Sequence, residues 1–275
     1  MPLRSRLIAV LCLLVLLSAS PAFAQYAGRG GLSDPATGET YRVEIGGFLW
    51  NPTPTLLVRS ESLEIIGDQI DFINDFEIDN ATFRQLRVAL RPARKHKFRF
   101  EYTPIRYNND EATLRRSIVF NGQRFDVALP VIADMKWNAM RFGYEWDFIY
   151  RDRGFLGLLL EAKYTDIEAS LENRIVGREF ARARAPIPAL GLIGRVYVVP
   201  NVAITGEFSG FKLPETIDED YQGRFYDFDL YGTLNFSDNF GVQAGYRSLT
   251  VFYRVELDEG DLKMKGLYFG GVVRF

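Results

Sequence analysis

Polar and apolar side chains alternate along most of this chain. The clearest runs are residues 98–102, 140–148 and 226–231, which read FRFEY, MRFGYEWDF and YDFDLY. A period of two predicts a β-strand whose two faces differ in polarity, and no segment has a convincing helical period. We therefore expect an all-β protein.

The first 24 residues differ from everything after them. Arg4 and Arg6 precede the unbroken apolar run 7–17, and Ala22-Phe23-Ala24 offers the small-x-small pattern that a signal peptidase cuts. The run is too short for a membrane-spanning helix of about 20 residues. We predict a cleaved signal peptide (1–24, cleavage after Ala24), a periplasmic N-terminal tail (25–39) and one β-domain (40–275).

Export would leave a mature chain without cysteine, because the only cysteine is Cys12. Disulfides, thiolate metal sites and a cysteine nucleophile are then excluded. Removing Arg4 and Arg6 from the 33 basic residues leaves 31 against 35 acidic ones. This near-neutral balance argues against a nucleic-acid partner.

The mature chain offers no span for a transmembrane helix. Its longest charge-free stretch, residues 45–58, contains two prolines. Two classes are left: a membrane β-barrel, or a secreted soluble β-sandwich or propeller. Strand alternation alone does not separate them, because both have one polar and one apolar face.

The pattern predicts ten strands, at about 40–51, 81–92, 96–107, 132–148, 155–168, 185–198, 201–212, 224–236, 239–257 and 262–275. Short connections follow the even strands, near 93–95, 150–154, 200–201 and 237–239. Longer connections, notably 52–80 and 108–131, follow odd ones. Transmembrane barrels have this asymmetry, with short periplasmic turns and longer outer loops.

The segment 108–131 makes the strand count ambiguous. Asn121-Gly122 lies between Ser117–Phe120 and Arg124–Val127, which is a strong signal for a hairpin turn. The hairpin either stands outside the membrane or adds two strands. A single antiparallel transmembrane β-barrel of ten strands is favoured, with twelve or eight as alternatives.

The end of the chain carries the decisive pattern. The final residue is aromatic, and apolar or small residues precede it at alternate positions: Leu267, Phe269, Gly271, Val273 and Phe275. This resembles the C-terminal assembly signal of Gram-negative outer-membrane β-barrel proteins of the small-barrel class. The resemblance implies insertion by the barrel-assembly machinery with help from periplasmic chaperones. It also implies contact with outer-membrane lipid and lipopolysaccharide, and an even strand count places both termini in the periplasm.

Charged residues on the predicted inward face suggest ion pairs across neighbouring strands. In a tight hairpin, residues equidistant from the turn face each other, which aligns one basic and one acidic residue in every predicted periplasmic hairpin. A fifth pair would cross the closing seam. The predicted lumen pairs are Arg87–Glu101, Arg141–Glu161, Arg195–Glu207, Asp229–Arg247 and Glu44–Arg274.

Catalytic chemistry has little support in the sequence. Known outer-membrane barrel enzymes mostly depend on a histidine, and the only one here, His96, lies among Arg94, Lys95 and Lys97 in a predicted periplasmic turn. The acidic stretch 61–77 is interpreted as a solvated outer hairpin rather than a calcium site. We expect no catalytic, cofactor or metal site.

The sequence leaves two functions open for such a barrel. One is a structural or surface-contact role with a lumen filled by side chains. The other is a narrow pore for small solutes. A secreted soluble β-protein is the third class, an outer-membrane hydrolase is disfavoured, and the sequence does not determine the oligomeric state or the source organism.

Overall fold

The computed structural model describes residues 36–60, 67–109, 111–127, 130–213, 221–255 and 258–275. The predicted signal peptide, its cleavage after Ala24 and most of the predicted N-terminal tail lie outside these residues. No helix among the described residues is long and apolar enough to cross a membrane.

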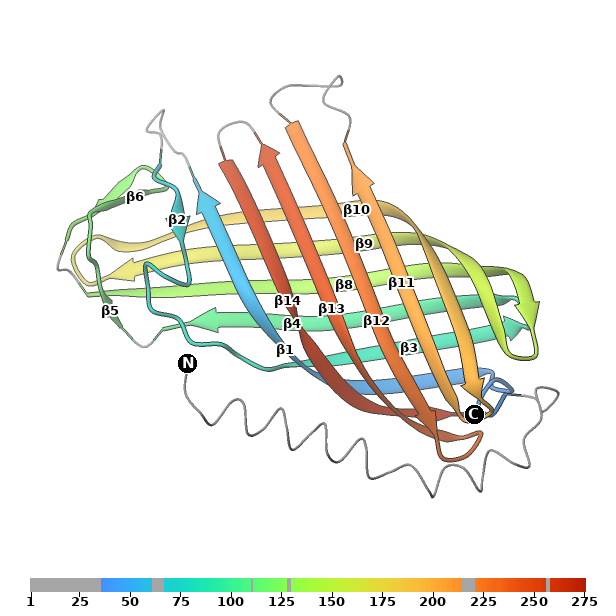
Figure 1. Cartoon of the computed structure of the whole chain (residues 1–275). Coiled ribbons are helices and arrows are strands. Elements are labelled where there is room, and N and C mark those ends of the chain that lie inside the picture. Colours follow the sequence, from blue (N-terminus) through green and yellow to red (C-terminus); the bar gives the residue numbers. More distant parts are fainter. Residues whose placement is uncertain (1–35, 61–66, 110, 128–129, 214–220, 256–257) are drawn as a thin grey trace.

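Ten long antiparallel strands form a closed barrel (Figure 1). Each long strand pairs with the next long strand along the chain. The last one, β14, pairs with β1 over sixteen residue pairs, from Glu44–Arg274 to Arg59–Glu259, and this closes the ring. The ten-stranded barrel is confirmed. The barrel strands are β1 (Val43–Arg59), β3 (Phe83–Ala93), β4 (His96–Asn108), β8 (Pro130–Arg151), β9 (Gly154–Asn173), β10 (Gly177–Val199), β11 (Val202–Lys212), β12 (Tyr221–Asn235), β13 (Phe240–Val255) and β14 (Asp258–Arg274).

The Asn121-Gly122 hairpin stands apart from the barrel wall. It joins β6 (Ile118–Phe120) to β7 (Gln123–Phe125), which pair only with each other. Both turn residues have positive φ, 50° and 76°, as the turn type preferred in two-residue hairpins requires. The twelve-strand alternative is therefore wrong. Two further short strands, β2 (Ile70–Asp71) and β5 (Ala112–Thr113), add to β1 and β8.

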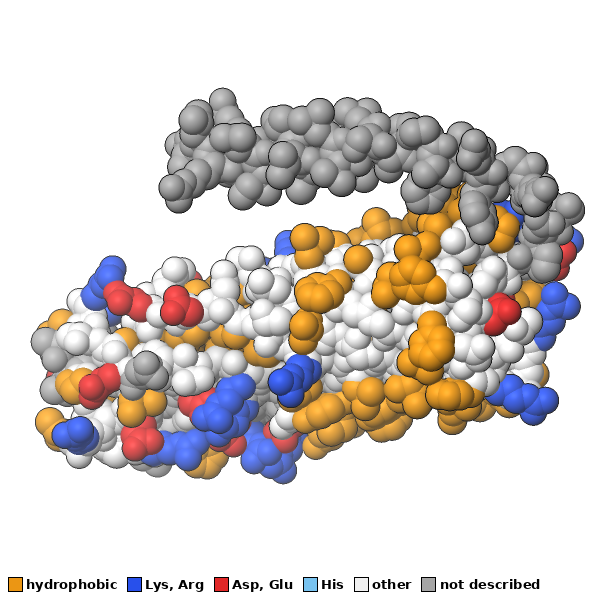
Figure 2. All heavy atoms as spheres, turned by 90° about the horizontal axis from the view of Figure 1, so that it is seen from below, with side chains coloured by type: hydrophobic (Ala, Val, Ile, Leu, Met, Phe, Trp, Pro, Cys, Tyr) orange, Lys and Arg blue, Asp and Glu red, His pale blue; other side chains and the backbone are white. Residues whose placement is uncertain are grey.

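The outward face of the wall is apolar over part of its height and charged beyond it. On β9 the outward residues run from Leu156 through Tyr164, and then become Asp166 and Glu168. Figure 2 shows the same change, with a band of hydrophobic side chains bordered by charged ones. Unpaired backbone cannot face lipid, and closure leaves no strand edge within the band. We assign this band to the membrane and call the long-loop end the outer end.

The inward face has the opposite order. Charged side chains fill the lumen at the level of the apolar band, and hydrophobic ones fill it towards the outer end. The outer core includes Trp50, Phe72, Phe76, Ile118, Phe120, Phe125, Trp137, Ile167 and Leu171. The outer part of the barrel is thus built like a soluble β-protein, with its apolar side chains inside.

This reversal explains where the predicted strand limits fail. Residues 52–59 belong to β1, and residues 169–173 and 177–184 extend β9 and β10, although all were expected in loops. Alternation continues there with the faces exchanged, as in the Arg–Ala run at 181–185. The same reversal buries Trp137 in the outer core, whereas Trp146 is exposed on the outward face.

Candidate functional site: a charged plug in the barrel lumen

Ten charged side chains meet inside the barrel at the level of the apolar band. We call them the lumen plug. Every one is at most 13% exposed, and each contacts at least one oppositely charged member. They are the basic Arg87, Arg99, Arg141, Lys163 and Arg247, and the acidic Glu101, Glu161, Glu207, Asp227 and Asp229.

Contacts in the plug cross the lumen. Arg87 Nη2 on β3 lies 2.9 Å from Asp229 Oδ2 on β12, and Arg99 Nη2 on β4 lies 2.6 Å from Glu207 Oε1 on β11. In each case the two strands are four places apart in the ring of ten. These pairs therefore span the interior, where the small circumference of a ten-stranded barrel brings opposite walls within reach of arginine.

Asp227 on β12 is a hub of the same network. It receives Arg247 Nη2 from β13 at 2.8 Å and Lys163 Nζ from β9 at 2.8 Å. Arg247 also donates to Glu101, which accepts from Arg141 Nη2 at 2.7 Å. The network thus links β3, β4, β8, β9, β11, β12 and β13 in one set of charge-assisted hydrogen bonds.

Three of the five predicted pairs are in contact. Arg87 lies opposite Glu101 in the register, with Nε 3.4 Å from Oε2. The Arg141 and Glu161 side chains meet at 3.5 Å. At the seam, Glu44 lies opposite Arg274 and accepts from its Nε at 2.5 Å.

The other two predicted pairs do not form, although Asp229 does lie opposite Arg247 in the register. The Asp229 carboxylate turns to Arg87, and Arg247 turns to Asp227. Glu207 lies opposite Ile193 rather than Arg195, and binds Arg99. Arg195 binds Glu39 instead, at 2.9 Å. Register fixes which strand positions face each other, but long charged side chains select partners across the lumen.

Several plug members were missed in the sequence. Arg99 and Asp227 lie two residues before the predicted inward Glu101 and Asp229, and Lys163 lies two residues after Glu161. Period-two alternation therefore puts all three on the inward face. The same alternation includes Lys97 and Glu145, each four residues from a predicted inward residue, and their Nζ and Oε1 atoms lie 2.5 Å apart. Lys97 and Glu145 lie directly opposite each other, but a long connection joins β4 to β8, so symmetry about the short turns does not relate them.

Aromatic side chains fill the remaining space around Arg87. Its guanidinium lies over the rings of Phe48 and Tyr268, 4.8 and 4.7 Å from their centroids, and Tyr268 donates to Asp229 at 2.8 Å. A cavity of about 30 Å³ lies beside Arg87, Glu101 and Arg141, on the order of one or two water molecules. The plug is therefore packed by protein rather than lined around a channel.

The N-terminal segment lies across the short-turn end of the lumen. Thr37 and Gly38 donate backbone hydrogen bonds to Pro200 and to Asp238, residues of two short turns. The Glu39 carboxylate contacts Arg195 at 2.9 Å and accepts from Tyr197 at 2.8 Å. Burial raises the pKa of Glu39, but Arg195 and Lys97 outweigh burial and hold the pKa below its usual value.

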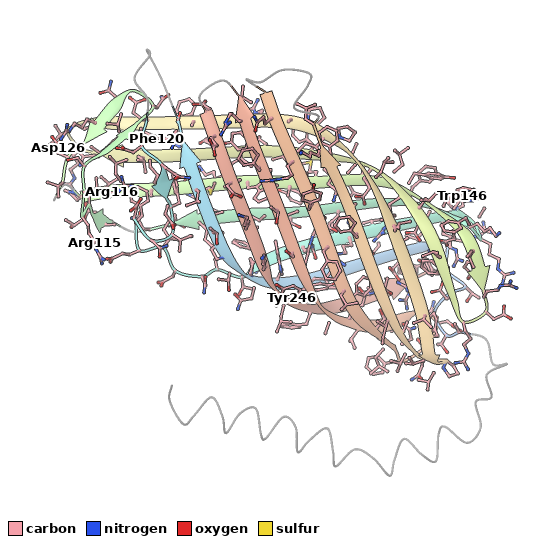
Figure 3. The ribbon with its side chains drawn as sticks, turned by 45° about the horizontal axis from the view of Figure 1, so that its top comes forward. Arg115, Arg116, Phe120, Asp126, Trp146 and Tyr246 are labelled. Atoms are coloured by element: carbon pink, nitrogen blue, oxygen red, sulfur yellow. The ribbon has the colours of Figure 1, made fainter. Side chains whose placement is uncertain are left out.

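The residues considered in the sequence for catalysis or calcium binding lie outside the plug and make structural contacts. His96 begins β4 at the short-turn end and bonds through Nδ1 to Tyr144 Oη at 2.6 Å. From the acidic outer stretch, Asp75 binds Arg116 at 2.9 Å and Glu77 binds Arg115, so the two long outer segments are joined by charge. Figure 3 places Arg115, Arg116, Phe120 and Asp126 together at the outer end. Within the described ranges, no group of three or more His, Cys, Asp or Glu could hold a metal ion.

The fold, rather than the sequence, connects this chain to known proteins. No family model and no curated protein matches the sequence. Among solved structures, the outer-membrane protease OmpT of Escherichia coli is similar with a TM-score of 0.55 and 8% identity, covering 89% of this chain and 100% of OmpT.

Two further outer-membrane proteins are more distant in shape. They are the attachment invasion locus protein Ail of Yersinia pestis (TM-score 0.38, 13% identity, 85% of this chain and 99% of Ail) and the toluene transporter TodX of Pseudomonas putida (TM-score 0.34, 7% identity, 89% and 93%). The similarity to OmpT, together with the closed ten-stranded ring, identifies the fold as that of a small Gram-negative outer-membrane β-barrel protein.

Proposed function

We propose that this protein is a sealed, non-enzymatic outer-membrane barrel that acts through its outer, cell-surface end. The lumen plug carries the proposal: oppositely charged side chains from seven strands meet across the interior at the level of the membrane. The outer core and the segment around Glu39 lie on either side of the plug. Three successive layers therefore stand in the way of a solute.

The outer end supplies a rigid platform for contact. Phe72, Phe76 and Ile118 anchor the two long outer segments in the outer core, and Arg116 binds Asp75 between them. Charged side chains such as Arg115 and Asp126 are exposed there. This combination of a fixed backbone with exposed charge suits a surface-contact role.

A belt of basic residues follows the outer boundary of the apolar band. Each member is the first or second outward position beyond the apolar residues of its strand: Arg84, Arg106, Lys136, Arg184, Lys212, Arg224 and Lys265. Guanidinium and ammonium groups at this depth attract anionic head groups. We propose that the belt contacts outer-membrane lipid, including lipopolysaccharide phosphates, and that the barrel-assembly machinery reads the Phe275 strand.

A swelling assay tests the seal. Proteoliposomes loaded with impermeant dextran swell when a small sugar enters through a pore. With arabinose, we expect no swelling beyond that of protein-free liposomes. Heat-modifiable gel migration verifies that the barrel in the proteoliposomes is folded. Swelling by arabinose would overturn the seal and favour the narrow-pore alternative.

Orientation has its own test, because the only cysteine, Cys12, lies in the predicted signal peptide. Val127→Cys places a thiol at the outer end and Asn201→Cys places one in a short turn; both positions are exposed. A membrane-impermeant maleimide should label the first variant in intact cells and the second only after the outer membrane is opened. The reverse pattern would overturn the proposed orientation.

A further inference from the structure

The barrel wall splits on one side above the apolar band. β10 pairs with β9 from Gly177 to Val196. Its pairing with β11 begins only at Leu190–Gly210, and β11 ends at Lys212. Within the described ranges, residues 177–189 of β10 thus have no ladder with β11, and Figure 1 shows β10 running far past the end of β11 along β9.

Proline protects part of this free edge. Pro186 and Pro188 lie in the half of β10 that has no partner other than β9 among the described residues, and proline removes backbone donors that would otherwise lack partners or recruit another strand. An unpaired edge is excluded from hydrocarbon, which agrees with the outward Arg182 and Arg184. The split therefore opens at the membrane surface.

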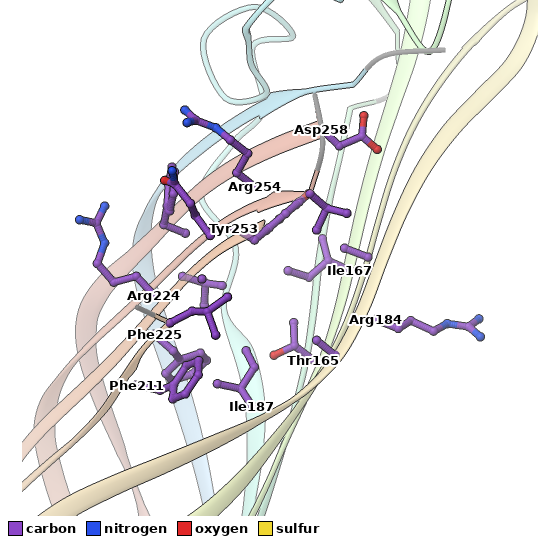
Figure 4. A pocket seen from close by; sticks show the side chains of 18 of the residues that line it. Thr165, Ile167, Arg184, Ile187, Phe211, Arg224, Phe225, Tyr253, Arg254 and Asp258 are labelled. Atoms are coloured by element: carbon purple, nitrogen blue, oxygen red, sulfur yellow. The ribbon is translucent and has the colours of Figure 1, made fainter. Parts of the chain in front are cut away.

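A pocket of about 530 Å³ lies in the split, within the range of small-molecule sites. Its walls are inward-facing apolar side chains, including Ala183, Ile187, Phe211, Phe225 and Val251. Ile167, Phe225 and Val251 also belong to the outer core. The pocket is thus a place where the core of the outer end is reached from the side (Figure 4).

Arginines surround the apolar pocket. Arg224 and Arg254 lie on one side and Arg184 on the other (Figure 4), and Arg59 and Arg182 complete the set. Asp166 binds both Arg182 and Arg184, at 2.6 and 3.2 Å. Arg182 also lies 3.5 Å from Glu168, and Arg254 binds Glu259 at 2.9 Å, so Arg184 shares its carboxylate with a second guanidinium. Arg59 Nε is buried and lacks a hydrogen-bond partner among the described residues. The rim therefore has guanidinium capacity for an anion.

We propose that this lateral pocket binds a single-chain anionic amphiphile that enters from the outer leaflet. The alkyl chain occupies the apolar pocket between β10 and β12. The head, a phosphate or a carboxylate, is held by the rim arginines, since guanidinium matches both oxyanions bidentately. The proposal goes beyond the sealed-barrel function and does not depend on it.

The test uses the full mature barrel in nanodiscs of phosphatidylcholine. Binding of radiolabelled dodecyl phosphate is measured against empty nanodiscs, which account for partition into lipid. We expect one saturable site per barrel. Dodecanoate should compete, whereas inorganic phosphate and dodecyl maltoside should not, because each lacks one of the two recognised parts.

Two variants with matched controls separate the parts of the pocket. Ala183→Trp fills the pocket and should abolish saturable binding, whereas Ala162→Trp, on the lipid-facing side of β9, should retain it. The combined change Arg184→Gln and Arg224→Gln should weaken binding about tenfold, equivalent to about 1.4 kcal/mol, whereas Arg115→Gln at the outer end should leave it unchanged. Heat-modifiable migration reports folding for each variant, and the arginine variants keep the test valid if Ala183→Trp fails to fold.

Three results would overturn the proposal. The first is the absence of a saturable site. The second is equal competition by dodecyl maltoside, which would mean an unselective apolar cavity. The third is competition by inorganic phosphate alone, which would mean a head-group site that does not bind the alkyl chain. Loss of this site would leave the swelling result untouched, so the two proposals fail separately.

Discussion

Arg87 on β3 is joined to Asp229 on β12, with 2.9 Å between Nη2 and Oδ2 and four strand positions between them around the barrel. Hairpin register alone pairs Asp229 with Arg247 instead. The two residues show how a narrow barrel uses charge: the contact crosses the lumen rather than tying neighbouring strands together.

This contact makes a double-mutant prediction. Removing one partner of a buried pair strands the other and costs about 3–5 kcal/mol, so Arg87→Ala and Asp229→Ala should each lower the urea midpoint of the barrel in detergent. The double variant should lose less than the two singles together, by about 1 kcal/mol or more. The control is the double-mutant cycle of Asp229→Ala and Arg247→Ala. These two residues lie opposite each other in the register but are not in contact, so their coupling free energy should be smaller. Larger coupling in the control would contradict the cross-lumen assignment.

A substitution in the outer core should destabilise the outer end of the barrel without destabilising its membrane-spanning part. Trp137 is fully buried there, and Trp137→Ala should cost about 3–5 kcal/mol locally. The expected readout is faster trypsin cleavage of the outer segments in intact cells, with the membrane strands still protected. Trp146→Ala provides the control, because Trp146 is 43% exposed on the outward face; equal cleavage of both variants would count against a packed outer core.

The Glu39 contacts predict a pH dependence. The pKa of Glu39 is lowered in the folded protein, so its contribution is complete above the unfolded value of about 4.5 and is lost as the pH falls through the folded value. Glu39→Gln should therefore lower the melting temperature at pH 7, and the difference from wild type should shrink in acid. A difference that stays constant from pH 7 to well below the unfolded value would show that charge is not the cause.

Phe275 should matter for assembly more than for stability. Its backbone makes the closing bonds, with its carbonyl accepting from Arg42 and Val43, whereas its side chain is 68% exposed. Phe275→Ala should keep the refolded stability in detergent and reduce the amount of barrel assembled in cells. Phe208→Ala, at another exposed outward phenylalanine, is the matched change; equal assembly of the two variants would argue against a terminal signal.

The number of strands, and which of their side chains point inward, could be predicted from the sequence because local side-chain chemistry determines both. Period-two alternation identified all ten barrel strands, and the Asn121-Gly122 turn marked its hairpin. The limits of β9 and β10 were missed because the polar and apolar faces exchange near Tyr164 and Asp166, where the surroundings change from lipid to water. A single face assignment cannot follow a strand through that boundary.

Side-chain partners were less predictable than register. Glu44 and Arg274 meet because they lie opposite each other at the seam, but Arg195 finds Glu39, a residue outside the barrel strands. The choice of Asp229 by Arg87 depends on the barrel diameter and on the rings of Phe48 and Tyr268. Neither the barrel diameter nor the position of these rings follows from hairpin register, which relates only neighbouring strands.

The central claim is that the lumen plug and the layers around it seal the barrel, and planar-bilayer conductance tests it most directly. Folded barrel, verified by heat-modifiable migration and inserted in 1 M KCl, should give no steady current and no discrete steps at moderate voltage. Discrete, voltage-independent conductance steps from the wild-type protein would contradict the account and identify an open pore.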